Sequence, residues 1–284
     1  LFEKIIKKTD ILTENYRADT MAKLGLGYDN LKIINPSLIY CAISGFGRSG
    51  PYASRGGYDL IAQGMSGLMS ITGEGPGRPP VKVGGPVCDI TAGILAAMGI
   101  LAAYIERQKT GQGQMVDTSL FEAGITHTYW QSAIALATGI APEPMGSAHP
   151  LNGPYQAVET ADGWITFSGA NSRNWERLTE LLGRSDLTHD PQFKDNAGRM
   201  ANSKNLMQIL SSEFKKKSGK FRDSDFEFRC FSCGNRQETC FALEKYFARS
   251  LNCEDTSICR AIEIFSNSRF PHEKHQNSMP HARN

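Results

Sequence analysis

The stretch LIYCAISG, residues 38–45, decides the fold class of this chain. It is a nearly continuous apolar run that ends in glycine, which is typical of a parallel strand buried on both faces beneath helices. Upstream, apolar residues at helical spacing lead into a short strand near residues 10–12, and a second helical segment at 30–34 stops at Asn35-Pro36. This order of helix, strand, helix, strand predicts an α/β layer.

Downstream of this strand, the chain alternates loops, helices and one further strand. Residues 45–88 are rich in glycine and proline, with one helix predicted at 60–69. Small and apolar residues lie nearly all round the helix predicted at 91–108, which indicates a buried helix. A strand is predicted at 115–119 and an apolar helix at 120–138.

Beyond residue 140 the pattern predicts a hairpin and a helix. The runs Tyr155 to Val158 and Gly163 to Phe167, joined by a turn that contains Asp162-Gly163, predict a β-hairpin. Trp175 to Leu182 predicts an amphipathic helix.

The composition is that of an ordinary globular protein. The 284 residues include 31 Lys and Arg against 29 Asp and Glu, and 40% are hydrophobic. This near-neutral balance gives no reason to expect nucleic acid or an anionic membrane as a partner. The longest small-apolar run, at 92–105, contains two glycines and is too short to span a bilayer, so we expect no membrane partner.

The character of the chain changes near residue 210. Of 28 glycines, 26 precede residue 211, whereas five of seven cysteines follow it. Cys230 and Cys233 invite a zinc interpretation, but the other spacings match no standard finger or ribbon, and we predict no metal site. We expect 211–284 to be a poorly ordered tail, and the chain, which opens at Leu1 in mid-pattern, to be a piece of a longer protein.

Asp89 is the candidate catalytic residue. It follows GGPVC, residues 84–88, immediately before the predicted buried helix. An aspartate there is plainly interpreted as an N-cap. The same position also suits a carboxylate nucleophile, because the helix dipole favours its ionised form and the glycines allow a substrate to approach closely. The residues alone leave both interpretations open.

A series of short motifs resembles the class III CoA-transferases, the CaiB/BaiF family, which includes formyl-CoA transferase and succinyl-CoA-dependent dicarboxylate transferases. The resemblance lies in the order and spacing of the motifs and covers about residues 1–210. They are Asn15-Tyr16-Arg17, Leu24-Gly25, Asn35-Pro36, Ser44-Gly45-Phe46-Gly47, Gly50-Pro51-Tyr52, Gly57-Tyr58-Asp59, Asp89, Lys109-Thr110-Gly111-Gln112-Gly113-Gln114 and Asp117.

The resemblance implies a Rossmann-like large domain, incomplete here, over 1–140, a small α+β domain over 141–210, and interlocked homodimers. The tail at 211–284 departs from the family. An intracellular protein is expected, of the cytoplasm or the mitochondrial matrix.

The resemblance also implies a reaction. Asp89 would attack an acyl-CoA thioester, forming a mixed aspartyl anhydride and releasing CoA, before a second carboxylic acid takes over. Coenzyme A is then a co-substrate, and neither a metal nor a tightly bound cofactor is needed. The expected partners are an acyl-CoA and a carboxylic acid, with dicarboxylic acids such as succinate among the candidates.

Seven further positions are candidate contacts by the same resemblance. Those for CoA are Asn15, Tyr16, Lys23, Leu24 and Arg55, and those for the substrate are Tyr58 and His149. Some have plain alternatives: Lys23 as a solvated helix residue, Tyr58 as a core aromatic and His149 as a structural loop histidine.

Two other functions stay open. The α-methylacyl-CoA racemases share the fold and the aspartate, but they place a histidine where this chain has Tyr58, so the second acid/base for α-proton transfer is missing. The other alternative is an inactive, truncated CoA-binding protein. Because the chain lacks family segments at both ends, we expect it to be a poor transferase.

Overall fold

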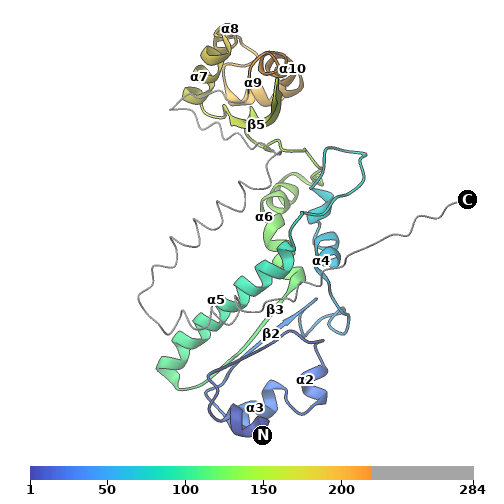
Figure 1. Cartoon of the computed structure of the whole chain (residues 1–284), viewed down its shortest axis with the longest axis vertical. Coiled ribbons are helices and arrows are strands. Elements are labelled where there is room, and N and C mark those ends of the chain that lie inside the picture. Colours follow the sequence, from blue (N-terminus) through green and yellow to red (C-terminus); the bar gives the residue numbers. More distant parts are fainter. Residues whose placement is uncertain (219–284) are drawn as a thin grey trace, which may run out of the picture.

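The computed structural model describes residues 1–218, whose N-terminal part is built on a three-stranded parallel sheet (Figure 1). Its strands, in the order β1-β2-β3, are β1 (Ile11–Glu14), β2 (Ile39–Ser44) and β3 (Met115–Ser119). The central strand pairs in parallel with both neighbours. Residues 39–42 of β2 are at most 1% exposed, which confirms the buried parallel strand and the α/β fold.

Two helices cover one face of this sheet. They are α1 (Phe2–Ile6) and α3 (Tyr28–Ile34), with the short α2 (Thr20–Lys23) between β1 and α3. Ile6 and Leu31 from these helices pack with Leu38, Tyr40 and Ala42 in one buried cluster. Alternate residues of β2 point to this face, as the period of a strand requires.

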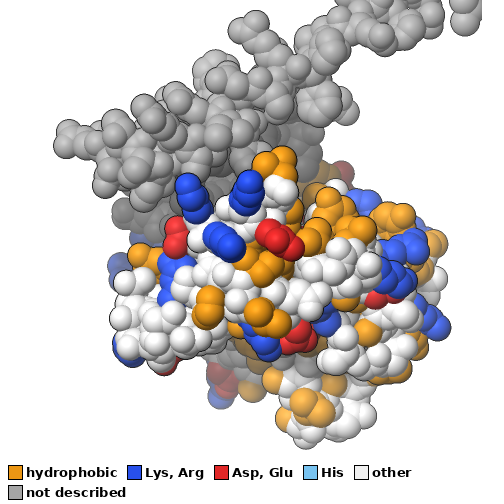
Figure 2. Space-filling view, turned by 90° about the horizontal axis from the view of Figure 1, so that it is seen from below, with side chains coloured by type: hydrophobic (Ala, Val, Ile, Leu, Met, Phe, Trp, Pro, Cys, Tyr) orange, Lys and Arg blue, Asp and Glu red, His pale blue; other side chains and the backbone are white. Residues whose placement is uncertain are grey.

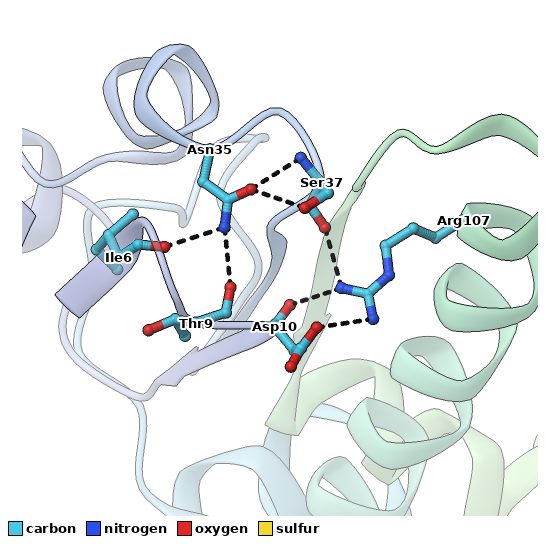
Figure 3. A network of polar contacts seen from close by, with 6 residues as sticks. All are labelled: Ile6, Thr9, Asp10, Asn35, Ser37 and Arg107. Atoms are coloured by element: carbon cyan, nitrogen blue, oxygen red, sulfur yellow. Dashed lines mark hydrogen bonds and ion pairs between the residues drawn. The ribbon is translucent and has the colours of Figure 1, made fainter. Parts of the chain in front are cut away.

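A polar network joins these helices to the amino edge of the sheet (Figure 3). The Asn35 amide donates to two carbonyls at the end of α1 and its oxygen accepts from Ser37. Arg107 donates to the carbonyls of Asp10 and Ser37 and forms an ion pair of 3.1 Å with the Asp10 carboxylate. The network therefore fixes the turns before β1 and β2 to one end of a long helix, α5 (Val87–Thr110).

The other face of the sheet is covered by α5 (Val87–Thr110), which packs on β2, β3 and α6 (Leu120–Thr138). Its contact side is made of small residues: Ala92, Ala96 and Ala103 are buried, and a Cβ added at Gly99 would lie 2.6 Å from the Val116 side chain. Small residues let the helix approach the sheet closely. The helix predicted at 60–69 is divided into α4 (Asp59–Met65) and a 3₁₀ turn (Leu68–Ser70).

The opposite side of α5 corrects the expectation of a fully buried helix. A stripe of large apolar residues along it is 54–62% exposed: Ile90, Ile94, Met98, Leu101 and Ile105. These residues recur every three or four positions, so they share one face of the helix. The described residues supply no element that covers this stripe, which we call the α5 stripe.

The length of α5 also corrects the expectation that the apolar run at 92–105 is too short to span a bilayer. The helix has 24 residues and an 18-residue window of mean hydropathy 1.8, so by length and composition it could cross a membrane. Core helices of globular proteins meet the same criterion, and only 22% of that window is buried here. Length and hydropathy alone are weak evidence that a helix spans a membrane, and the small-residue side of α5 packs on the sheet.

The remaining described elements form a second body at the far end of the molecule from α2 and α3 (Figure 1). They are the predicted hairpin, β4 (Tyr155–Thr160) and β5 (Gly163–Ser168), followed by α7 (Ser172–Leu182), α8 (Asp186–His189), α9 (Asn196–Ala201) and α10 (Ser203–Phe214). Trp175, Leu206 and Leu210 lie in its single buried core. The Phe167 and Phe214 rings pack in the same core, 4.9 Å apart.

The predicted start of the tail at residue 211 is wrong, because it falls inside α10. Leu210 and Phe214 are one turn apart on this helix and both are buried. The expectations of poor order and of no zinc site for 219–284 lie outside the described residues.

The surface seen in Figure 2, looking from below Figure 1, carries charges of both signs. Lys and Arg side chains are interspersed with acidic and hydrophobic ones over the described part of this face. No extended field of one sign is visible there that would attract a polyanion.

Candidate active site at the carboxyl edge of the sheet

The carboxyl ends of the parallel strands meet at one edge of the sheet, where α/β proteins place their ligands. The loop after β2 touches the loop before α4 at this edge through two glycines. A Cβ on Gly45 would lie 2.5 Å from the Gly57 Cα, and one on Gly57 would lie 2.3 Å from the Gly45 Cα. Only glycine fits at both positions. The contact brings Tyr58 and Asp59 to the end of β2.

Asp59 joins the first residue of α4 to the first turn of α5. Its Oδ1 accepts a hydrogen bond of 2.9 Å from the backbone N–H of Cys88. The N-cap of α5 is Pro86, which offers no capping side chain, so Asp59 satisfies an otherwise unpaired N–H from another helix. The sequence places Asp59 in the motif Gly57-Tyr58-Asp59 but does not predict its bond to α5.

Asp89 is the third residue of α5, three positions after the N-cap Pro86, so the plain capping interpretation is wrong. Its side chain is exposed and makes no hydrogen bond to any described residue. Partial burial, and secondly the negative charge of Asp59, raise the pKa of the Asp89 carboxyl above its ordinary value. A more basic carboxylate without a hydrogen-bond partner is suited to nucleophilic attack.

The neighbouring thiol does not compete with this carboxylate. Cys88 is fully buried, and burial, followed by the charges of Asp59 and Asp89, raises the pKa of its thiol to about 11. The thiol is therefore protonated near neutral pH and inert as a nucleophile.

A second carboxylate, Glu14, organises the end of β1. It is buried, accepts a 2.8 Å hydrogen bond from the Tyr16 N–H, and pairs with Arg48 at 3.1 Å. The Tyr40 hydroxyl also donates to it at 3.2 Å, and burial together with Glu14 raises the pKa of Tyr40 to about 12. The backbone N–H of Arg48 donates to Asp117, the central residue of β3, so one cluster spans all three strands.

This cluster fixes the backbone of the Asn15–Tyr16 segment and leaves its side chains exposed. The Tyr16 ring is 59% exposed and Tyr58 is 77% exposed at the same edge of the sheet. Tyr58 is therefore not the core aromatic of the plain alternative. Exposed aromatic faces on a fixed backbone can stack on a flat ligand.

Three candidate contacts lie on short surface segments. Lys23 forms an exposed ion pair with Asp19, one turn earlier, and Leu24 is 64% exposed. The Arg55 guanidinium lies 4.3 Å from the centre of the Tyr52 ring. No contact among the described residues ties any of the three to Asp89.

His149 lies apart from this edge, in the segment before the hairpin. Its Nδ1 accepts hydrogen bonds from the backbone N–H groups of Leu151 and Asn152, and its ring stacks on Tyr155. Its edge also contacts Trp130. These contacts are typical of a structural loop histidine and assign the proton to Nε2.

A cavity of about 940 Å³ adjoins His149 rather than Asp89. It lies between the end of α6 and the α9–α10 segment, and its walls include His149, Tyr155 and Arg199. None of the residues that gather around Asp59 and Asp89 lines it. Among residues 1–218, no cluster of His, Cys, Asp or Glu could hold a metal ion.

The fold and this edge define the class: a parallel α/β protein that presents an exposed carboxylate in the first turn of a helix. The model of CoA-transferase family III matches residues 1–227, so the chain belongs to that family. The match extends beyond the predicted limit at about residue 210 and through the whole of α10.

Known relatives are similar over the same part of the chain. The succinate–glutarate CoA-transferase of Agrobacterium fabrum is 40% identical over 213 residues, which is 75% of this chain and 53% of that protein. The human succinyl-CoA:glutarate CoA-transferase is 35% identical, covering 74% and 49%. The crystal structure of a CaiB/BaiF family protein from Brucella suis aligns with a TM-score of 0.66 at 39% identity, covering 76% and 57%. The chain thus spans about half the length of the curated relatives it matches.

Proposed function

We propose that this protein transfers CoA between carboxylic acids through an acyl intermediate on Asp89. The observation that carries the proposal is the exposed Asp89 carboxylate, in the first turn of α5 and without a competing hydrogen bond among the described residues. Membership of CoA-transferase family III supports the same reaction class.

In the proposed reaction, an Asp89 oxygen attacks the thioester carbon of an acyl-CoA. The carbon–sulfur bond breaks, CoA leaves as its thiolate, and a mixed anhydride joins Asp89 to the acyl group. The thiolate then attacks the aspartyl carbonyl, which releases the first acid as a carboxylate and leaves Asp89 as a CoA thioester. Attack by the second carboxylate, followed by return of the thiolate, yields the new acyl-CoA and free Asp89.

Dicarboxylic acids are the proposed substrates. The relatives with 35–40% identity include succinate–glutarate, oxalate and mesaconate CoA-transferases. We propose that Tyr16 stacks on the CoA adenine, and the exposure of its ring on a backbone held by Glu14 supports this role. We include a homodimer in the proposal, since the α5 stripe offers an apolar face to a partner.

The test is conversion of succinyl-CoA and glutarate to glutaryl-CoA by the 284-residue chain. Asp89→Asn should abolish the product, because an amide is a far poorer nucleophile than a carboxylate of similar shape. Asp29→Asn is the matched control, since Asp29 is exposed on α3 and pairs only with Lys32 among the described residues. Equal turnover by wild type and Asp89→Asn would contradict the proposal.

A CoA-binding protein without turnover is the second candidate. The chain's match to only about half the length of the curated relatives supports it. This candidate predicts that the wild-type chain binds CoA in a calorimetric titration and yet forms no glutaryl-CoA.

A further inference from the structure

Gln63, in the second turn of α4, is fully buried and bonded at both ends of its side chain. Its Oε1 accepts a 2.8 Å hydrogen bond from the backbone N–H of Val83. Its Nε2 donates a 2.6 Å hydrogen bond to Oδ2 of Asp59. The two partners fix the orientation of the amide, because the N–H requires an oxygen and the carboxylate requires a donor.

The two oxygens of Asp59 face different partners. One accepts from Gln63 and the other accepts from the N–H of Cys88. The pair on α4 therefore holds both ends of residues 83–88, the segment that leads into Asp89. This segment contains Gly84 and Gly85, which restrict the backbone least, so its path depends on such contacts.

We propose that Gln63 is a positioning residue for Asp89. Its buried amide holds Asp59 against the first turn of α5 and binds Val83, at the start of the glycine-containing segment that precedes α5. The inference rests on the proposed function for its catalytic consequence and on hydrogen bonds alone for its geometry. The titratable groups that interact with Asp59 are the Cys88 thiol and the Asp89 carboxylate, both on α5.

Two substitutions separate positioning from simple packing. Gln63→Met keeps the length of the side chain but removes both hydrogen bonds. Gln63→Glu keeps an acceptor for Val83 and sets a carboxylate against Asp59, so the bridge forms again only when the pair shares a proton. The rate of the Gln63→Glu variant, relative to wild type at the same pH, should therefore rise as the pH falls. A packing defect would not show this pH dependence.

The reaction is followed as the rate of hydroxamate formation at Asp89, with the 284-residue chain, succinyl-CoA and hydroxylamine. Gln63→Met should lower the rate about 100-fold at every pH, since a misplaced nucleophile loses its alignment. Gln63→Glu should match that loss at high pH, and its rate as a fraction of the wild-type rate at the same pH should approach one as the pH falls. Gln108→Met, a change on the exposed end of α5, is the matched control and should leave the rate unchanged.

Amide hydrogen exchange tests the geometry without any turnover. The Cys88 N–H should be protected in wild type and in Gln108→Met and should exchange faster in Gln63→Met, although Gln63 does not touch Cys88 itself. Unchanged Cys88 exchange, or a Gln63→Glu profile with no recovery at low pH, would overturn the positioning role. If the wild-type chain forms no hydroxamate while the variants still show these exchange changes, the proposed function is overturned and the positioning geometry stands.

Discussion

The two bodies of this chain bury their apolar residues in different ways. The body built from β4, β5 and α7–α10 encloses most of its large apolar side chains in one core, with Trp175 and Phe167 at most 2% exposed. The sheet body buries most of β2, but its described residues leave the α5 stripe uncovered. The first body thus has a closed core, whereas the second leaves an apolar face open.

Arg199 provides the strongest test of the closed body. It is 1% exposed and donates to the carbonyls of Gly153, Phe193 and Ala170, with its guanidinium 5.2 Å from the centre of the Trp175 ring. Burial lowers the pKa of the Arg199 guanidinium, because the charged form has lost hydration.

Arg199→Met should leave these three carbonyls without a partner and lower the free energy of unfolding of this body by about 3 kcal/mol. Amide exchange should rise across residues 155–214 and stay unchanged in β1–β3. Arg173→Met, an exposed change on α7, is the control. Equal loss of protection in both bodies would show that they unfold as one unit.

The two sides of α5 should respond in opposite ways to substitution. Ala96→Leu places a large side chain on the closely packed side and should lower the free energy of unfolding by about 1–3 kcal/mol, measured by urea denaturation. Met98→Gln, on the α5 stripe, should change it by less than about 0.5 kcal/mol and reduce self-association in sedimentation runs. A large destabilisation by Met98→Gln would mean that the stripe is covered.

The carboxyl edge should bind CoA through Tyr16. Tyr16→Ala should weaken CoA binding in calorimetry by about tenfold, because stacking on a base contributes about 1–3 kcal/mol. Trp164→Ala, a change of an exposed aromatic on β5 of the other body, is the control. Equal affinities of Tyr16→Ala and wild type would remove Tyr16 from the site.

The smallest expected effect is on the pH profile of Asp89. Its raised pKa means that the rate of hydroxamate formation should fall, as the pH is lowered, at a higher pH than for a carboxyl with the ordinary value of 3.8. Asp59→Asn removes the nearby like charge and keeps an acceptor for Cys88, so it should move this midpoint downward. A midpoint that rises in Asp59→Asn would contradict the conclusion that the Asp59 charge raises the pKa of Asp89.

Apolar runs and periodicity in the sequence predicted individual strands and helices. The run at 38–45 identified β2, because a strand buried on both faces is a continuous apolar run. Asp89 stays a prediction, based on the glycine-rich segment before a helix. Periodicity could not show which side of α5 would be covered, since both sides are apolar. The end of α10 was missed because a change in composition near residue 210 hid the spacing of Leu206, Leu210 and Phe214.

The links within the site were beyond sequence reasoning, because they join residues far apart in the chain. Asp59 reaches Cys88 across 29 positions and Arg48 reaches Asp117 across 69. One signal was available: Glu14 follows the strand predicted near residues 10–12, and a carboxylate after a strand of a parallel sheet lies beside the loops of neighbouring strands.

The most direct test of the proposed acyl transfer locates the intermediate by peptide mass. The chain is incubated with succinyl-CoA and hydroxylamine, digested, and sequenced across residues 83–107. The account predicts a hydroxamate on Asp89, absent from Asp89→Asn and from wild type without acyl-CoA. Modification of Asp59 or Cys88 instead, or an unmodified Asp89 in a chain that still forms glutaryl-CoA, would contradict it.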